Sequence, residues 1–319
     1  MNLLVTGGYG FIGSAFIREA LNKNKVNKLV NLDCLTYAAN YDSLAEVEDD
    51  HRYIFRKGDI RKYENVYDTF YAHDITHVAH FAAETHVDNS IEGPRAFVET
   101  NIIGTFNLLE CAKKFKIKRF HHISTDEVYG QLGKTGKFSP SSPYDPQNPY
   151  SATKASSDFL VRSYGHTFSV NYTISNCSNN YGPFQNNEKF IPVVIESLLR
   201  GDKVPVYGKG NNVRDWIYVD DHAQAVWKIL TRGKRGETYL VGANNERTNL
   251  QIVKSICEIL NLNPEESIQF VKDRAGHDFR YAIDASKTTK ELNWNPKKDF
   301  ETGLKETIEW YTKNLNEEL

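Results

Sequence analysis

The chain has 319 residues, of which 40% are hydrophobic, and its formal net charge is -2 at pH 7 with a sequence pI near 6.6. This length accommodates one large domain or two coupled domains with a sizeable core. The near-neutral charge argues against a surface that wraps nucleic acid, although a local basic pocket for a phosphate is compatible with it.

The sequence predicts neither a membrane span nor export. No run approaches the roughly 18 apolar residues that a span requires, and the N-terminal residues lack the charged start and long apolar centre of a signal peptide. The cysteines lie far apart without C-x-x-C spacing, which indicates neither a zinc site nor a disulfide framework. We therefore expect a cytoplasmic protein without nucleic-acid or membrane partners.

Short apolar segments alternate with helical patterns from residue 2 to residue 177. Residues 2–6 form an apolar run that ends at Gly7-Gly8, and apolar residues recur at helical spacing from Phe11 onward. This alternation predicts an α/β fold with a doubly wound parallel sheet of the Rossmann type. Further strands are predicted at residues 28–32, 52–55, 77–82, 119–124 and 171–176, and long helices at 97–115 and 150–168.

After Cys177 the pattern becomes irregular, because asparagine, glycine and proline crowd residues 179–187 and later elements are shorter. We predict a first domain over residues 1–177 and a smaller C-terminal α/β lobe that makes up most of residues 178–319. Residues 213–240 are expected to return to the first domain, with a strand at 216–219 and the following helix rejoining its sheet.

A glycine-rich loop connects the first strand with the first helix. Gly7-x-x-Gly10-x-x-Gly13 lets the backbone approach a pyrophosphate, while the helix N-terminus supplies N–H groups and a partial positive charge. Asp33, at the end of the second strand, is placed to accept a hydrogen bond from a ribose 2′-hydroxyl and would repel a 2′-phosphate. The loop and the acid predict that residues 1–177 bind NAD rather than NADP.

Tyr150 and Lys154 are four residues apart on a predicted helix, so their side chains share one face. A free phenol titrates near pH ~10, but a nearby ammonium and a cationic nicotinamide favour its ionised form. Tyr150 can then act as the base for a hydroxyl proton. This spacing also occurs on surface helices, so the prediction depends on the neighbouring glycine loop.

Thr125, Asp126 and Glu127 follow the strand predicted at 119–124, where open α/β sheets place residues that contact ligands. The first two could instead simply cap a helix start. Eliminating water from a sugar needs a base for a carbon-bound proton and an acid for the departing hydroxyl, and the two carboxylates supply one candidate for each. Together with the tyrosine and lysine, they predict a sugar-nucleotide dehydratase.

Short segments along nearly the whole chain carry a family resemblance: LTYA at 35–38, GDI at 58–60, FAAETHVD at 81–88, STDEVYG at 124–130, YSATK at 150–154, NNYGP at 179–183, RDW at 214–216, NERTN at 245–249 and RAGHD at 274–278. In these segments the chain resembles the extended short-chain dehydrogenase/reductases and, within them, the dTDP-glucose 4,6-dehydratases. Related epimerases generally lack the Asp-Glu pair.

The resemblance implies that Tyr150, assisted by Lys154, removes the 4-hydroxyl proton while the C-4 hydride passes to NAD+, and that Thr125 orients this hydroxyl. Glu127 would then take the C-5 proton and Asp126 would protonate the leaving 6-hydroxyl, before the hydride returns to C-6. The resemblance also implies cofactor contacts at Gly7, Gly10, Phe11, Ile12, Gly13, Asp33, Thr36, Asp59, Ile60, Ala82, Ala83, Thr100, Tyr150 and Lys154. It implies nucleotide-sugar contacts at Thr85, Asn180, Lys189, Pro205, Tyr207, Arg214, Asn249, Arg274 and His277, of which the two arginines suit phosphate oxygens.

A few positions depart from the family pattern. Asn186-Asn187 stands where a Phe-Pro pair is expected, Thr85 where serine is usual, Asn89 where arginine is usual and Ala275 where proline is usual. Because most of these changes fall near the sugar or the base, a UDP-sugar such as UDP-N-acetylglucosamine is the alternative substrate, and an epimerase is a further alternative.

An NAD-binding sensor without turnover is the alternative from a different class, and the intact pairs of catalytic candidates argue against it. The histidines show no spacing that completes a metal site, so we expect no bound metal. The helical segments at 94–115 and 150–168 resemble those through which family members pair, which implies a homodimer.

Overall fold

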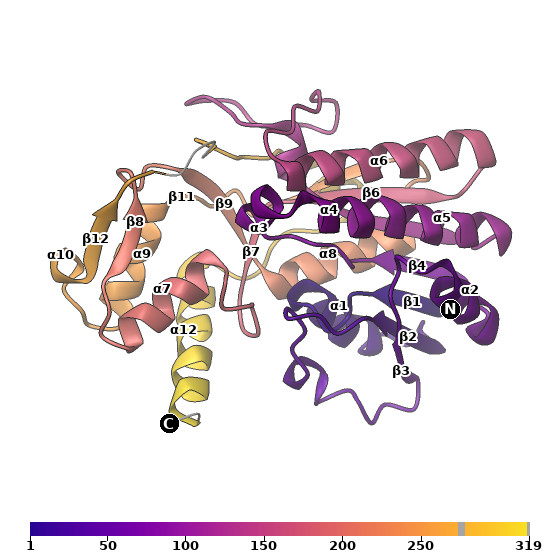
Figure 1. Ribbon diagram of the computed structural model, residues 1–319, viewed down its shortest axis with the longest axis horizontal. Coiled ribbons are helices and arrows are strands. Elements are labelled where there is room, and N and C mark those ends of the chain that lie inside the picture. The colour runs from indigo at the N-terminus through magenta and orange to yellow at the C-terminus, as the bar shows by residue number, and fades with distance from the viewer. Residues whose placement is uncertain (274–277, 318–319) are drawn as a thin grey trace.

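The computed structural model describes residues 1–273 and 278–317 and has a large and a small lobe (Figure 1). Seven parallel strands form the main sheet in the order β3-β2-β1-β4-β5-β6-β10, which confirms the predicted doubly wound Rossmann architecture. The chain direction across the sheet reverses between β1 and β4, the place where such sheets bind ligands. The strands are β1 (Asn2–Thr6), β2 (Lys28–Asp33), β3 (Tyr53–Lys57), β4 (His77–His80), β5 (Arg119–Thr125), β6 (Tyr172–Cys177) and β10 (Thr238–Val241).

Helices cover both faces of this sheet. Leu4 and Val30 belong to the core on one face, and Leu3, Val5 and Leu29 to the core on the other, because successive side chains of a strand alternate. With both faces buried, the strands are nearly continuous apolar runs. The first face packs against α2 (Tyr63–His73), α5 (Thr105–Lys114) and α6 (Pro149–Phe168), and the second against α1 (Phe11–Leu21) and α8 (Val219–Arg232).

The long helix predicted at residues 97–115 is divided into three elements. α4 (Pro94–Phe97) leads into a π-helical segment, η2 (Val98–Gly104), which continues into α5. π-Helical turns are rare and are frequently found at functional sites. In this segment the Asn101 amide donates to the Glu84 carbonyl at 3.1 Å and to Thr153 Oγ1 at 3.0 Å, so it joins the cleft-lining segment after β4 to α6.

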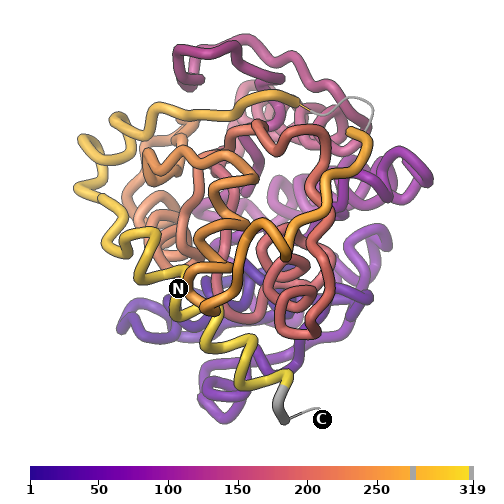
Figure 2. The backbone as a smooth tube through the Cα atoms, turned by 90° about the vertical axis from the view of Figure 1, so that its left-hand side faces the viewer, coloured from indigo at the N-terminus to yellow at the C-terminus, as the bar shows by residue number. Residues whose placement is uncertain are grey.

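The small lobe lies beside the carboxyl ends of the main-sheet strands and faces the viewer in Figure 2. Its core combines aromatic and aliphatic side chains from α7, α9, α12 and β8. The lobe contains β7 (Asn179–Tyr181), β9 (Val213–Tyr218) and β11 (Glu246–Thr248) in one small sheet, β8 (Val204–Tyr207) and β12 (Ile268–Val271) in another, and α7 (Phe190–Leu199), α9 (Asn249–Ile259), α10 (Pro264–Ser267) and α12 (Phe300–Glu317). The remaining elements are η1 (Asp42–Leu44), α3 (Val87–Glu92), η3 (Asp126–Tyr129) and α11 (Ser286–Leu292).

The chain crosses between the lobes more than once. The strand expected at 216–219 does not rejoin the main sheet, because β9 instead pairs with β7 and β11. The helix that follows it, α8, packs against α1, and β10 then adds to the main sheet beside β6. Residues 213–240 therefore contribute to both lobes.

Candidate active site

A cleft lies at the carboxyl ends of the main-sheet strands, where the sheet reverses direction. Every residue predicted to contact the cofactor lines it, and so do Thr125, Asp126 and Glu127. The side chains come from the loop after β1, the ends of β2 and β5, η2 and α6. Residues that are as far apart in sequence as Gly7 and Lys154 are thus brought together in one place.

The glycine loop leaves no room for side chains. Gly7 has φ +71°, and a Cβ atom there would lie 2.7 Å from the Ala82 backbone. A Cβ on Gly13 would lie 2.2 Å from the Gly7 carbonyl oxygen. Gly10 caps α1 without a side-chain hydrogen bond, so the N–H groups of the first turn remain available for an anion. The close packing and the exposed N–H groups fit a pyrophosphate.

Asp33 is fixed by the backbone around it. Its carboxylate accepts hydrogen bonds from Tyr9 N at 2.9 Å and Leu35 N at 2.8 Å. Each oxygen retains a further lone pair, which suits a ribose hydroxyl. Burial raises the pKa of this carboxyl, and the backbone N–H groups partly offset the effect. The adjacent Asp59 is paired with Arg61, whose guanidinium binds both of its carboxylate oxygens.

Tyr150 and Lys154 project from the first turns of α6, which begins at a capping box formed by Asn148 and Ser151. Lys154 Nζ donates to the Ile123 carbonyl at 2.7 Å, and burial lowers its pKa to about 8. Burial and the nearby Glu127 raise the pKa of Tyr150 well above its usual value, while a hydrogen bond with Thr125 lowers it. In the protein alone the phenol is therefore neutral at pH 7, so its ionisation requires an additional positive charge.

The two carboxyls at the end of β5 differ in their surroundings. Asp126 is 2% exposed, and its Oδ2 atom has no hydrogen-bond partner among the residues described by the structure. Burial, Glu127 and Asp215 raise the pKa of Asp126 well above its usual value. Burial also raises the pKa of Glu127, but Arg214 and Asn148 oppose this effect. Asp126 is therefore the better proton donor and Glu127 the better proton acceptor.

The capping interpretation of this segment also holds in part. Thr125 Oγ1 accepts a hydrogen bond from Glu127 N at 3.2 Å and so caps η3. The same hydroxyl lies 3.4 Å from Asp126 Oδ1. Thr125 therefore both caps η3 and lines the cleft.

Only part of the predicted nucleotide-sugar set reaches the cleft. Thr85, Asn180 and Lys189 line it, and Lys189 Nζ donates to the Thr85 carbonyl at 3.1 Å. Asn180 already has two partners, because its Nδ2 donates to the Ser178 carbonyl and its Oδ1 contacts His222 Nδ1 at 2.9 Å.

The other predicted nucleotide-sugar residues lie outside the cleft lining. Arg214 is buried, donates to the carbonyl oxygens of Val213 and Asp278, and lies over the Tyr281 ring at 4.3 Å. The remaining residues are in the small lobe: Pro205 and Tyr207 on the exposed face of β8, and Asn249 at the start of α9. Arg274 and His277 lie outside the described residues.

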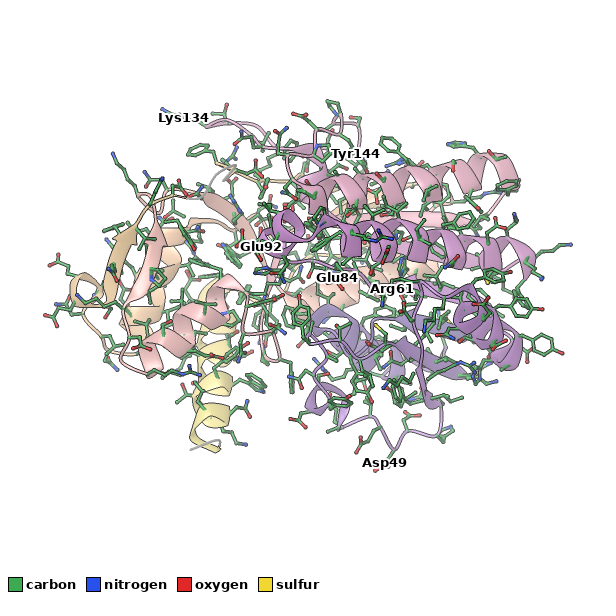
Figure 3. All side chains as sticks on the ribbon, viewed as in Figure 1. Asp49, Arg61, Glu84, Glu92, Lys134 and Tyr144 are labelled. Atoms are coloured by element: carbon green, nitrogen blue, oxygen red, sulfur yellow. The ribbon has the colours of Figure 1, made fainter. Side chains whose placement is uncertain are left out.

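Some cleft residues were not predicted. Arg61, Glu84 and Glu188 line the cleft, and Arg61 and Glu84 are close enough to interact electrostatically (Figure 3). The fully buried Asp158, one turn after Lys154 on α6, accepts hydrogen bonds from Tyr144 and Ser124 behind the cleft. Its spacing of four residues from the lysine was the available sequence signal.

Within residues 1–273 and 278–317, no helix is long and apolar enough to cross a membrane. The same residues contain no group of three or more histidine, cysteine, aspartate or glutamate side chains placed to hold a metal ion.

Comparison with known proteins gives the family. The sequence model of the GDP-mannose 4,6 dehydratase family matches residues 4–307. A dTDP-glucose 4,6-dehydratase from Escherichia coli is 48% identical over 99% of this chain and 94% of its own length. The crystal structure of DesIV, a dTDP-glucose 4,6-dehydratase from Streptomyces venezuelae with NAD and TYD bound, superposes with a TM-score of 0.96 at 42% identity, covering 99% of this chain and 98% of the other. The dTDP-glucose 4,6-dehydratase of Bacillus anthracis in complex with NAD gives 0.92 at 44% identity, with 99% and 98% covered. The chain therefore belongs to the GDP-mannose 4,6 dehydratase family and, within it, to the dTDP-glucose 4,6-dehydratases.

Proposed function

We propose that this protein binds NAD and converts dTDP-glucose to dTDP-4-keto-6-deoxyglucose. The observation that carries the proposal is the presence of Asp126 and Glu127 in the same cleft as Tyr150 and Lys154. A tyrosine and a lysine suffice for oxidation at C-4, whereas the loss of water also needs an acid and a base. The relatives named above share this activity and, in the solved structures, hold NAD.

Oxidation at C-4 falls to the residues of α6 and the end of β5. NAD, when bound in the cleft, supplies the hydride acceptor at C-4 and the hydride donor at C-6, and its oxidised ring carries the positive charge that Tyr150 needs. Tyr150 takes the proton of the 4-hydroxyl, and Lys154 favours the phenolate by its own charge. Thr125, which hydrogen-bonds with the phenol, orients the sugar hydroxyl.

Elimination uses the two carboxyls in opposite roles. A 4-keto group makes the C-5 proton acidic, and Glu127, held closer to its ordinary ionisation by Arg214 and Asn148, removes it. Asp126 stays protonated because of burial and the adjacent Glu127, and it donates that proton to the leaving 6-hydroxyl. The Asp126 Oδ2 atom, without a protein partner in the described chain, suits contact with that hydroxyl.

The nucleotide sugar is held from the small lobe. Lys189, at the N-cap of α7, and Thr85, after β4, both line the cleft, and Lys189 Nζ donates to the Thr85 carbonyl at 3.1 Å. A UDP-sugar is the second candidate substrate, because Asn186, which also lines the cleft, introduces an amide where the family resemblance leads us to expect an apolar pair. An amide can donate to an acetamido oxygen, which an apolar side chain cannot.

The test is incubation with dTDP-glucose, UDP-glucose and UDP-N-acetylglucosamine in turn, followed by mass spectrometry for the loss of one water. We expect the loss with dTDP-glucose. The double variant Asp126→Asn, Glu127→Gln should bind NAD as tightly as the wild type but lose water at least about 100-fold more slowly. Unchanged release of water by that variant would disprove the assigned roles.

We also propose that the protein is a cytoplasmic homodimer that pairs through residues 94–115, which form α4, η2 and α5, and through α6. These helices pack side by side and leave apolar side chains exposed, among them Ile103 on η2, Phe106 on α5 and Phe159 on α6. The cysteines in the described chain are free thiols, which suits a reducing compartment. Analytical ultracentrifugation should give twice the chain mass, and Phe106→Asp should shift it toward the monomer.

A further inference from the structure

A buried carboxylate lies on the same helix as the catalytic lysine and interacts with it electrostatically. Asp158 is 0% exposed and stands one helical turn after Lys154 on α6. Its Oδ2 atom accepts hydrogen bonds from Tyr144 OH at 2.7 Å, Ser124 Oγ at 3.0 Å and Asn176 Nδ2 at 3.4 Å. Its Oδ1 atom lies 3.3 Å from His122 Nε2. Several elements thus converge on one side chain that does not itself line the cleft, although one of its hydrogen-bond donors, Ser124, does.

The aspartate is ionised in this environment. Burial raises the pKa of Asp158, but the interactions with His122, Lys154 and Tyr144 outweigh it and leave the pKa below its ordinary value. His122 does not neutralise this charge, because burial and the nearby Lys154 lower its pKa to about 4. The buried negative charge therefore needs a different cation.

Lys154 and Arg162 are the cations beside Asp158. Arg162 is half-buried and donates to Tyr144 OH at 3.3 Å and Thr238 Oγ1 at 2.9 Å, so solvent shares in balancing its charge. Lys154 is 5% exposed, and the Ile123 carbonyl is its hydrogen-bond acceptor. A neutral carbonyl does not compensate the positive charge of an ammonium that burial has desolvated.

The other titratable groups near Lys154 leave Asp158 as its main counter-charge. His80 on β4 and His122 on β5 are neutral, and Cys177 on β6 is a protonated thiol at pH 7 because burial raises its pKa to about 12. Tyr150 and Tyr129 are neutral phenols in the protein alone, because burial raises the pKa of both. Asp126 and Glu127 act on Tyr150, and neither is among the groups that shift the pKa of Lys154.

We propose that Asp158 is a positioning residue that keeps the Lys154 ammonium protonated at neutral pH, and so lets Lys154 promote ionisation of Tyr150. This inference rests on the proposed function, since it concerns the oxidation step. Asp158 itself touches neither substrate nor cofactor. The hydrogen bonds from Tyr144, Ser124 and Asn176 hold its charge one turn from the lysine instead of letting it rotate away.

The experiment compares Asp158→Asn with Tyr144→Phe. The asparagine keeps the shape and can still accept from Tyr144 and Ser124, but it removes the charge. We expect the alkaline limb of kcat for dTDP-glucose dehydration to move down by about 1–2 pH units, because an adjacent opposite charge shifts a pKa by about that amount. Turnover at pH 7.5 should fall roughly tenfold, while KM changes little.

Tyr144→Phe is the matched control, because it removes the 2.7 Å hydrogen bond to Asp158 and leaves the carboxylate charge in place. Its alkaline limb should stay within a few tenths of a unit of the wild type. Equal shifts in both variants, or no shift in Asp158→Asn, would overturn the inference and point to a packing role. If the wild type itself makes no dehydrated product, the proposed function has failed instead, so the two failures are distinguishable.

A second measurement applies if Asp158→Asn does not fold. In the wild type, NMR titration of ¹³Cε-labelled lysine, with Lys154 assigned by its loss in Lys154→Arg, should show a protonated side chain at pH 7. A Lys154 side chain that is neutral at pH 7 in the intact protein would refute the role of Asp158.

Discussion

Gly13→Ala is the sharpest test of the cofactor loop, because alanine brings one methyl group and nothing else. The new Cβ would lie 2.2 Å from the Gly7 carbonyl oxygen, whereas a carbon–oxygen contact ordinarily needs about 3.3 Å. The loop must therefore move by about 1 Å. The loop has little freedom to move, because Gly7 N donates to the Leu32 carbonyl at 3.0 Å and the Ala82 backbone lies close to the Gly7 Cα atom.

Two opposing effects decide the magnitude. In a helix, alanine is favoured over glycine by about 0.5–1 kcal/mol, whereas overpacking a rigid contact costs about 1–3 kcal/mol. Because Gly13 belongs to α1 and its clash is with the loop that precedes the helix, we expect the cost to appear mainly in NAD binding. A cost of this size corresponds to NAD affinity reduced by about 5- to 150-fold.

The assay is calorimetric titration of cofactor-stripped protein with NAD, together with urea unfolding of the same samples. Gly133→Ala is the control, because a Cβ at that position would meet nothing within 4 Å. It should bind NAD like the wild type. Wild-type affinity in folded Gly13→Ala, or a gain of stability without loss of binding, would show that the loop can adjust and that its close packing is not what shapes the NAD site.

Three further predictions concern the acid, the helix cap and the substrate lysine. Because the pKa of Asp126 is raised above its unfolded-state value near 3.8, the protonated side chain stabilises the folded protein fully below pH 3.8, and this stabilisation is lost as pH rises through the folded-state pKa. Asp126→Asn should therefore gain stability relative to the wild type as pH rises. Thermal melts of the two proteins that stay parallel between about pH 4 and 9 would contradict this. Asn148→Ala removes the capping box of α6 and should lower the free energy of unfolding by about 1 kcal/mol, whereas Asn148→Ser keeps a cap and should lose less; equal losses in urea melts would count against the cap. Lys189→Ala should raise KM for the nucleotide sugar by about tenfold or more without changing NAD affinity, and a parallel loss of NAD binding would mean that the lysine serves the cofactor.

The local signals in the sequence predicted the main sheet well. The apolar run before Gly7, the helical spacing after Phe11 and the acid at position 33 all concern neighbouring residues, and they describe β1, α1 and β2 correctly. These signals are reliable because a strand buried on both faces and a tight glycine turn each restrict residue type locally. The catalytic candidates line one cleft because parallel strands end on the same side of the sheet.

The misplaced features depend on contacts that are distant in sequence. Nothing in the apolar pattern of residues 97–115 marks the π-helical segment, whose Asn101 finds partners in two other segments. The prediction that β9 joins the main sheet was wrong, because a short buried strand such as 213–218 suits either lobe and it pairs with β7 and β11. The guanidinium of Arg214, whose chemistry suits a phosphate, donates to carbonyl oxygens in the structure, and its contact with the nucleotide sugar stays a prediction. The spacing of Asp158 from Lys154 is visible in the sequence, but its burial is not, because periodicity alone does not quantify burial.

The position of β10 has a consequence for biosynthesis on the ribosome. Its partner, β6, precedes it by roughly sixty residues, and the intervening chain builds part of the small lobe. At typical translation rates, about 5–20 residues per second, β6 waits for several seconds with one backbone edge unsatisfied. An exposed edge of a strand that is normally buried, such as β6, is a template for aggregation. We therefore expect chains truncated before residue 238 to be held by chaperones, and chains in which residues 238–241 have left the ribosome to be released.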